Sequence, residues 1–249
     1  MIELHGRAAR AGLASMFGAP EDILLTTCLQ GYTGRAAMTE NGRSAALLTG
    51  DFAFLAGDPD PAALRWLSQS KKGQLIISGA PGWLRMAQGV GRAWEKAVRY
   101  AFDTPESWDT AHLTAMIHAL PEDFALRPMD GALYARCRGV EQLRDLCGCA
   151  RDEAAFFAHG LGVAALHGNE IAGGASAYAW DDTGIEVEID TLPPFRCQGV
   201  AAACGAALIL RCLAANRRVH WDAANAVSAR LAERLGFLPR GTYEVIQWL

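Results

Sequence analysis

One continuous stretch, residues 184–214, constrains the fold of this chain more than any other. In residues 184–191 apolar and acidic side chains alternate, as in a β-strand with one buried face. A short loop with two prolines follows, and residues 199–214 form a run rich in small residues that predicts a helix. A strand that leads through a tight loop into a helix is typical of a layered α/β fold.

The sequence after residue 120 predicts a mixed sheet, mostly antiparallel, with helices around it. Short apolar or alternating runs mark the strands, and His167-Gly168-Asn169 suits the tight turn of a hairpin. The predicted strands are residues 124–128, 161–166, 170–178, 184–191, 218–223 and 240–249, and the predicted helices are residues 131–138, 140–146, 152–159, 199–214 and 225–235.

The first part of the chain predicts a smaller α/β region, residues 1–120. Residues 51–56 and 74–78 are typical of short strands, and residues 61–70 between them begin with proline and space their leucines as a helix does. Pro121 and two acids follow a helical stretch and predict the boundary with a second domain, residues 121–249. Four of the seven tryptophans lie in the first region, either in its core or around a substrate pocket: Trp66, Trp83, Trp94 and Trp108.

The composition limits the classes of function that are open to the chain. Its formal net charge of −4 argues against a nucleic-acid-binding protein, which normally carries a basic patch. No run of about 18 apolar residues predicts a membrane span, and the first residues do not resemble a secretion signal. We therefore expect a cytoplasmic protein whose seven cysteines are reduced thiols. Cys147 and Cys149 lack the spacing of a zinc site, so no metal is expected.

The loop before the helix of residues 199–214 has the chemistry of a phosphate-binding site. Its backbone N–H groups and the positive end of the helix dipole point toward one place. Gly199 lets the backbone approach a phosphate without a Cβ, Ala201 keeps the next turn thin, and Arg196 adds a charged donor. The same pattern also arises by chance, as a surface arginine near a loop glycine. The strand before it and the helix after it favour a pyrophosphate cradle.

A second motif lies downstream, with Trp221, Asn225 and Ser228 followed by Leu235-Gly236-Phe237. Together with residues 186–191 and the Arg196-x-x-Gly199-x-Ala201 pattern, it resembles the GCN5-related N-acetyltransferase (GNAT) superfamily over residues 121–249. Residues 126–130 are similar to the usual first strand and turn of that superfamily. Residues 156–162, 188–191 and 221–233 further resemble a bacterial subgroup that includes the zwittermicin A self-resistance acetyltransferase.

This resemblance implies a fold and a cosubstrate. It implies that strand 184–191 splays from strand 218–223 and that the pantetheine arm of acetyl-coenzyme A lies in the opening. The pyrophosphate would then lie over residues 198–203, and the position of Asn225 often helps to hold the coenzyme in relatives. The residues that the resemblance assigns to coenzyme binding are Asp190, Thr191, Leu192, Arg196, Gln198, Gly199, Val200, Ala201, Ala202, Asn225 and Ser228.

Three acidic residues supply the candidates for proton transfer. Glu186, Glu188 and Asp190 alternate along one strand and therefore share a face. An amine attacks a thioester only when it is neutral, so a carboxylate beside the acetyl group can serve as the base. Crowding of like charges raises at least one of the pKa values toward the useful range. Glu188 is the predicted base, assisted by Glu186 and Asp190, and the alternative is a solvated sheet face.

The acid that protonates the departing thiolate is harder to assign. Many relatives carry a tyrosine seven residues after the asparagine, where this chain has Ala232. Tyr243, Ser228 and Tyr178 are the candidate replacements, water is a further alternative, and Tyr243 joins the two glutamates as a candidate catalytic residue. Three histidines without a partner in the sequence are predicted to be packed or exposed: His159, His167 and His220.

The favoured function is an acetyl-coenzyme A-dependent N-acetyltransferase that acts on the amine of a small molecule by direct attack. One alternative is a coenzyme A-binding sensor or interaction module without catalysis, which Ala232 favours. Another is the acetylation of a protein N-terminus or lysine. Because the second domain contains nothing that would recognise a particular amine, the first region is predicted to pack on the acceptor side of the site. The sequence is compatible with a homodimer.

Overall fold

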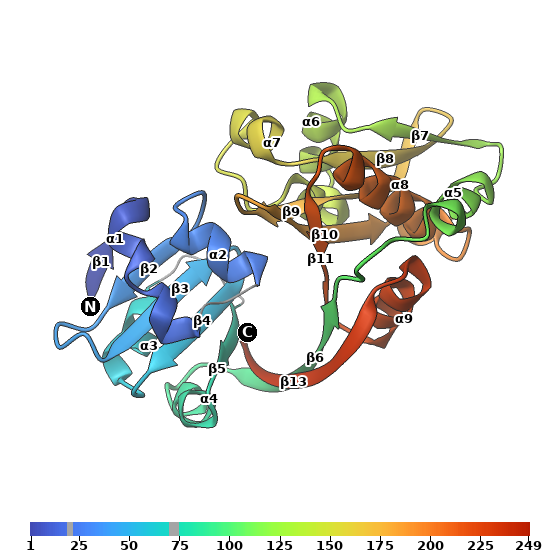
Figure 1. Cartoon of the computed structure of the whole chain (residues 1–249). Helices are drawn as coiled ribbons and strands as arrows, with labels where there is room; N and C mark the ends of the chain where they lie inside the picture. Colours follow the sequence, from blue (N-terminus) through green and yellow to red (C-terminus); the bar gives the residue numbers. More distant parts are fainter. Residues whose placement is uncertain (19–21, 70–74) are drawn as a thin grey trace. The chain divides into compact units, whose positions relative to one another are not determined.

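The computed structural model describes residues 1–18, 22–69 and 75–249, and the chain divides into two compact units (Figure 1). Met1–Arg99 and Thr242–Leu249 form the first unit, and Tyr100–Gly241 form the second. Ser70, at the end of a predicted helix, and Gln74, at the start of a predicted strand, lie outside the described residues.

The division into units differs from the predicted boundary between residues 120 and 121. The helix before that boundary, α5 (Thr110–His118), packs against α8 (Val200–Ala214) and belongs to the second unit. The last strand, β13 (Leu238–Trp248), runs into the first unit, where its end pairs with β5 (Leu75–Gly79). Packing between distant parts of the chain, which local sequence patterns do not encode, sets this division.

The first unit is a sheet flanked by helices. Its other strands are β1 (Ile2–Leu4), β2 (Arg35–Met38), β3 (Ser44–Thr49), β4 (Phe52–Gly57) and β6 (Trp94–Asp103), and its helices are α1 (Arg7–Ala11), η1 (Ala14–Phe17), α2 (Ile23–Leu29), α3 (Pro61–Ser68) and α4 (Pro81–Gln88). The strand order is β1-β2-β3-β4-β5-β13-β6. Strands β1 to β4 pair antiparallel, whereas β5 lies parallel to β4 after the crossover helix α3.

The core of the first unit gathers tryptophan and aliphatic side chains. Trp83 and Trp248 are fully buried in it, and Trp66 is nearly so. Trp94, in contrast, is partly exposed. Trp108 belongs to the second unit. Core packing, one of the two roles predicted for the tryptophans, is therefore the role of Trp66 and Trp83.

Replacing Trp248 by alanine should destabilise the first unit. The indole Nε1–H donates a hydrogen bond to the Ala87 carbonyl oxygen at 3.0 Å. Truncation of a buried tryptophan costs about 3–5 kcal/mol, so the thermal transition measured by calorimetry should fall. Leu249→Ala changes an exposed side chain next to it and should alter stability by less than about 0.5 kcal/mol. Equal effects of the two substitutions would contradict this account of the core.

The second unit contains a five-stranded sheet of order β11-β10-β9-β8-β7. All neighbours pair antiparallel except β10 and β11, which pair parallel, so the predicted mixed and mostly antiparallel sheet is confirmed. Its strands are β7 (Phe124–Pro128), β8 (Gly162–His167), β9 (Glu170–Trp180), β10 (Gly184–Thr191) and β11 (Arg218–His220), followed by the short β12 (Asp222–Ala223), and its other helices are α6 (Gly131–Gly139), η2 (Glu141–Cys147), α7 (Glu153–His159), η3 (Pro193–Phe195) and α9 (Ala226–Leu235).

The same order of elements occurs twice along the chain. Each series has a strand, short helices, three antiparallel strands, a crossover helix, a strand parallel to the last of the three, a further helix and a final strand. The first series runs from β1 to β6 and the second from β7 to β13, and α5 connects them. In the second series β11 and β12 together take the place of β5. The two series of elements thus share one topology.

The final strand of each series pairs with a strand of the other series. β13 pairs antiparallel with β5 through Ile246–Ile77 and Trp248–Leu75. β6 pairs antiparallel with β12 through Asp222–Ala101 and Ala223–Tyr100. This exchange of final strands explains why the boundary between the units falls within β6 and β13.

All seven cysteines are free thiols, as predicted for a chain without disulfides. Within the described ranges, no helix combines the length and the apolar character that crossing a membrane requires. In the same part of the chain, no three His, Cys, Asp or Glu side chains are grouped as metal ligands.

Candidate active site

The loop between β10 and α8 contains two residues with left-handed backbone conformations. Cys197 and Gly199 adopt left-handed backbone conformations, with φ of 60° and 85°. Arg196 Nε donates to the Thr191 carbonyl oxygen at 3.1 Å, and Gln198 Nε2 donates to a carbonyl oxygen of η3 at 3.0 Å, so side chains of the loop hold its shape. A turn that includes left-handed residues makes a concavity of N–H groups that suits an anion.

The first turn of α8 has no side-chain cap. Gly199 occupies its N-cap position, and a Cβ placed there would meet nothing within 4 Å. The first N–H groups of α8 therefore receive no hydrogen bond from a cap side chain. By contrast, an Asp or Asn side chain caps each of six other helices: α2, α3, α5, α6, α7 and α9.

The helix that takes the place of α8 in the first series, α3, is closed to an anion. Asp60 Oδ1 accepts a hydrogen bond from the Ala62 N–H at 2.7 Å. Pro61, the first helical residue, has no N–H to offer. A carboxylate already satisfies this helix start and would repel a phosphate. Of these two crossover helices, only α8 presents a start that suits an anionic ligand.

The ladder between β10 and β11 ends halfway along β10, as the predicted splay of these strands requires. They pair only between residues 184–186 and 218–220, whereas β10 continues to Thr191. The Leu192 N–H donates to the Ala172 carbonyl oxygen of β9 at 2.9 Å. Because backbone groups alternate along an antiparallel ladder, those of Ile189 and Thr191 point to the opposite, open edge.

Glu188 lies in the middle of the acidic row on β10 and is half-buried. Its Oε1 accepts a hydrogen bond from the Ile189 N–H at 3.1 Å, which brings the carboxylate to the open edge. Burial raises the pKa of Glu188 to about 8, and the charges of Asp190 and Asp145 add to the rise. A carboxyl group with this pKa exchanges protons near neutral pH, as a base for an amine requires.

Asp190 continues the acidic row toward the loop. Burial raises the pKa of Asp190 to about 6, Asp145 of η2 adds to the rise, and Arg196 opposes it. The aliphatic row of β10 lies on the other face, since Ile189 Cδ1 is 3.4 Å from the place that a Cβ on Gly205 of α8 would take. The predicted separation of β10 into an acidic and an apolar face is therefore correct.

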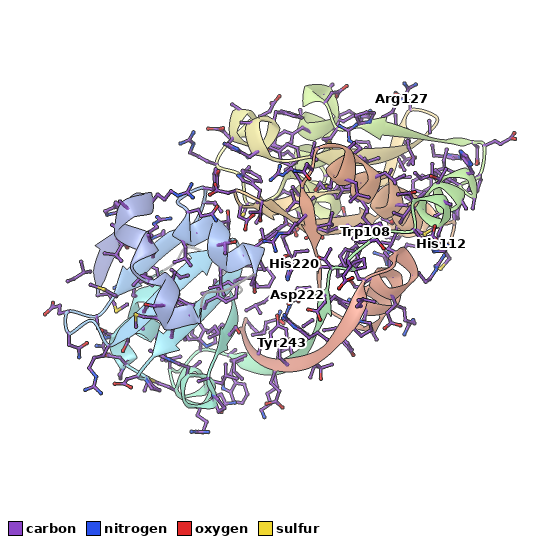
Figure 2. The ribbon with its side chains drawn as sticks, in the orientation of Figure 1. Trp108, His112, Arg127, His220, Asp222 and Tyr243 are labelled. Atoms are coloured by element: carbon purple, nitrogen blue, oxygen red, sulfur yellow. The ribbon has the colours of Figure 1, made fainter. Side chains whose placement is uncertain are left out.

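Glu186 lies at the point where β10 and β11 separate and is 3% exposed. One carboxylate oxygen forms a hydrogen bond with Nδ1 of His220, and the other accepts the Asp222 N–H at 3.1 Å. Figure 2 labels His220 and Asp222, which precede and follow Trp221 in the sequence. The sequence predicts His220 to be packed or exposed without a partner, because the register of two strands joined through a helix is not visible in it.

Two hydroxyl groups of this sheet have no hydrogen-bond partner among the described residues. They are Ser176 Oγ and Thr191 Oγ1, and both atoms are buried. Ser176 lies directly opposite Glu188 on β9 and shares its face of the sheet. A buried hydroxyl without a partner costs free energy, and Ser176 was not among the predicted site residues.

Asn225 and Ser228 lie at the start of α9. Asn225 Oδ1 accepts hydrogen bonds from the N–H groups of Val227 and Ser228, both at 3.0 Å, so Asn225 caps the helix. The Ser228 hydroxyl accepts the indole N–H of Trp221 at 3.2 Å. Each side chain thus has a structural role, and their contact with a coenzyme stays a prediction.

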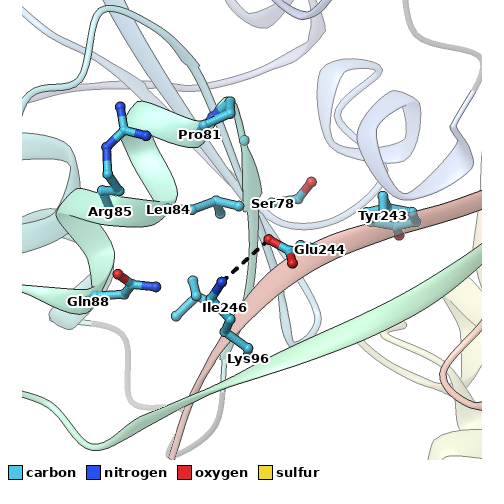
Figure 3. Close-up of a pocket in the computed structure, with 10 residues that line it drawn as sticks. Ser78, Pro81, Leu84, Arg85, Gln88, Lys96, Tyr243, Glu244 and Ile246 are labelled. Carbon is cyan, nitrogen blue, oxygen red and sulfur yellow. Dashed lines mark ion pairs between the residues drawn. The ribbon is translucent and has the colours of Figure 1, made fainter.

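The candidate acids are dispersed. Ala232, at the position of the missing tyrosine, is fully buried on α9, and Tyr178 of β9 is 7% exposed. Tyr243 lies in the first unit, where it lines a cavity of about 490 Å³ (Figure 3). Lys96 and Glu244 form an ion pair in this cavity at 3.7 Å. The catalytic role of Tyr243 stays a prediction.

The raised pKa of Glu188 predicts that stability falls as pH rises. The folded state keeps a proton up to about pH 8, whereas the ordinary pKa of a glutamate is 4.5. The contribution of this group is fully present below pH 4.5 and is lost as pH rises through about 8. Urea unfolding of Glu188→Gln should therefore show a gain relative to the wild type that grows between pH 5 and pH 9. Glu170→Gln, at an exposed position, is the control, and a gain independent of pH would contradict the buried carboxyl.

Comparison with known proteins agrees with this geometry. A sequence model described as GNAT acetyltransferase matches residues 14–246. A solved structure described as a GCN5-related N-acetyltransferase-like protein from Streptococcus suis 89/1591 is 34% identical, with 98% of this chain and 100% of that chain covered and a TM-score of 0.90. A search of curated proteins found no match.

Two more distant structures share the fold. A GCN5-related N-acetyltransferase from Kribbella flavida is 17% identical, with 96% of this chain and 95% of that chain covered and a TM-score of 0.53. A tandem GNAT protein from the clavulanic acid biosynthesis pathway is 12% identical, with 99% and 97% covered and a TM-score of 0.60. With the family match over most of its length, the chain belongs to the GNAT acetyltransferase family and is an acyltransferase.

Proposed function

We propose that the second unit transfers an acetyl group from acetyl-coenzyme A to the amine of a small molecule. The observation that carries the proposal is the uncapped start of α8 next to the open edge of β10. An anionic, extended cosubstrate fits these two features together. The start of α8 suits its phosphates, and the open edge of β10 suits hydrogen bonds along its pantetheine arm.

The loop residues supply the coenzyme contacts in this proposal. The backbone N–H groups of Gln198, Gly199, Val200, Ala201 and Ala202 hold the pyrophosphate, and Arg196 adds positive charge. The open edge at Thr191 pairs with the pantetheine arm, whereas the backbone groups of Asp190 and Leu192 point to β9, where the Leu192 N–H is already bonded. Asn225 and Ser228 flank the coenzyme at the start of α9.

The chemistry in this proposal is direct attack of a neutral amine on the thioester carbonyl. Glu188 takes the amine proton, since its pKa of about 8 lies closer to that of an amine than an ordinary glutamate's does. Asp190 adds negative charge to the same face and favours a cationic acceptor. A place in the subgroup of the zwittermicin A self-resistance acetyltransferase is part of the proposal and rests on sequence pattern alone.

A second candidate is a coenzyme A-binding sensor without catalysis. Ala232 at the position of the usual tyrosine, fully buried, favours it. The two candidates differ in turnover, because a sensor binds acetyl-coenzyme A and leaves its thioester intact.

The test uses the full chain. Calorimetric titration with acetyl-coenzyme A measures binding, and loss of thioester absorbance with a panel of primary amines measures turnover. A thiol-specific reagent is less suitable, because Cys197 is exposed and would react with it. We expect binding and many turnovers with at least one amine. Binding without turnover for the whole panel would favour the sensor, and no binding would refute both candidates.

A further inference from the structure

The pair formed by Glu186 and His220 is the most deeply buried ionisable pair described in the second unit's sheet. The side chain of Glu186 is 4% exposed and that of His220 is 19% exposed. Glu186 also accepts the Asp222 N–H, so two donors hold its carboxylate in place. Burial of a carboxylate costs desolvation energy, which its hydrogen-bond partners must offset. Here the two partners come from β11 and β12.

The pair marks the inner end of the opening. Glu186 and His220 are the last partners in the parallel ladder of β10 and β11. Directly paired residues share a face of a sheet, so the His220 ring lies on the face that carries Glu188. The other charged groups that act on this face are Asp190 of β10 and Asp145 of η2.

The hydrogen bond fixes how the imidazole is used. A carboxylate bonded to Nδ1 stabilises the protonated form of the ring. This arrangement of carboxylate, histidine and reacting group recurs where a histidine transfers protons.

We propose that His220, positioned by Glu186, protonates the thiolate of coenzyme A as it departs. The proposal rests on the proposed function and assigns the role that Ala232 leaves open. The amine nitrogen forms a bond to the carbonyl carbon, and the C–S bond breaks with its electron pair on sulfur. The imidazolium Nε2–H gives its proton to that sulfur, Glu188 takes the proton of the amine, and exchange with solvent restores both groups. Glu186 acts through His220 and is a positioning residue.

The chain offers a matched control for this pair. His167 and Asp123 form a second histidine–carboxylate pair, with Nε2 and Oδ2 3.0 Å apart, in the same unit. Their side chains are 43% and 60% exposed, so this pair is at the surface. His167→Gln removes an imidazole and its carboxylate bond without touching the opening.

The first test compares His220→Gln with His167→Gln in the full chain. Acetyl-coenzyme A affinity should change little in either variant, whereas the thermal transition should fall in His220→Gln alone, because that substitution removes a partner of the buried Glu186 carboxylate. We expect kcat of His220→Gln to fall about 10²-fold. This is the lower end of the range for removal of a general acid or base, because a thiolate is a good leaving group. The limb of the pH–rate profile that requires a protonated group should disappear as well, and His167→Gln should keep both kcat and profile.

The second test does not depend on turnover. Glu186→Gln keeps an acceptor for the Asp222 N–H but removes the negative charge. The pKa of His220, followed through its ring protons by NMR in coenzyme-free protein, should fall by about 1–3 units. In kinetics the same variant should shift the pH limb in the same direction and lower kcat more than it changes KM.

The outcomes distinguish a failure of the proposed function from a failure of the role of His220. A wild-type chain that binds acetyl-coenzyme A without turnover overturns the proposed function, and the role of His220 with it. A wild type that turns over, with His220→Gln retaining kcat and the pH limb, overturns the role of His220 alone. If the His220 titration is unchanged in Glu186→Gln, the positioning role of Glu186 is wrong.

Discussion

Glu188→Gln should lower kcat about 10²–10⁴-fold at neutral pH, the range for loss of a general base. The variant keeps the size of the side chain and an oxygen that can accept the Ile189 N–H, so the dissociation constant for acetyl-coenzyme A should change by less than about threefold. Because the base acts when ionised and its pKa is about 8, the wild-type rate should rise with pH through about 8.

The measurement is a pH–rate profile for both proteins with the same amine. Glu170→Gln removes an exposed carboxylate from β9 and should leave the profile unchanged. Turnover of Glu188→Gln close to that of the wild type would place the base elsewhere, with Asp190 as the next carboxylate to test.

Gly199→Pro should weaken acetyl-coenzyme A binding by about 10²-fold or more. Gly199 has φ of 85°, which proline cannot adopt, and proline also removes one N–H from the loop. Loss of a hydrogen bond to a charged group costs about 1.5–3 kcal/mol, and the displaced helix start adds to that loss. Calorimetric titration measures the change.

Two further variants separate the causes of this loss. Gly199→Ala keeps the N–H and meets no neighbouring atom within 4 Å, so it tests the cost of the left-handed conformation alone. Gly91→Pro places the same substitution at another glycine with positive φ, in the first unit, and should leave coenzyme affinity unchanged. Unaltered affinity of Gly199→Pro for acetyl-coenzyme A would contradict the binding of the phosphates at the start of α8.

The elements that local patterns encode were predicted closely. The alternating run of residues 184–191 is β10 within the same bounds, and the small-residue helix begins one residue after its predicted start. Gly236 ends α9 in a left-handed conformation, as a glycine after a helix commonly does. These signals are strong because each depends on neighbours a few residues away.

The first unit was predicted less well, for a physical reason. β3 is buried along its whole length, so apolar residues occur at every position and the alternation that marks a strand is lost. β2 is short and two of its four residues are alanine, which has little preference for strands. Without these strands, the repetition of one topology in the two halves of the chain was not visible.

The candidate site shows the same limit. Glu188 and its face follow from alternation, but the bond between Glu186 and His220 follows from the register between β10 and β11. That register depends on how α8 returns the chain to the sheet. The hydroxyl of Ser176 was missed because its significance comes from its partner position on β9 and from burial.

The exchanged final strands have a consequence for how the chain folds during synthesis. The edge of β5 that pairs with Ile246 and Trp248 has no strand to cover it until the whole second unit has left the ribosome. An uncovered edge beside apolar side chains is prone to pair with other chains. The first unit is therefore translated first but completed last, and a nascent chain held before residue 246 would depend on a chaperone to stay soluble.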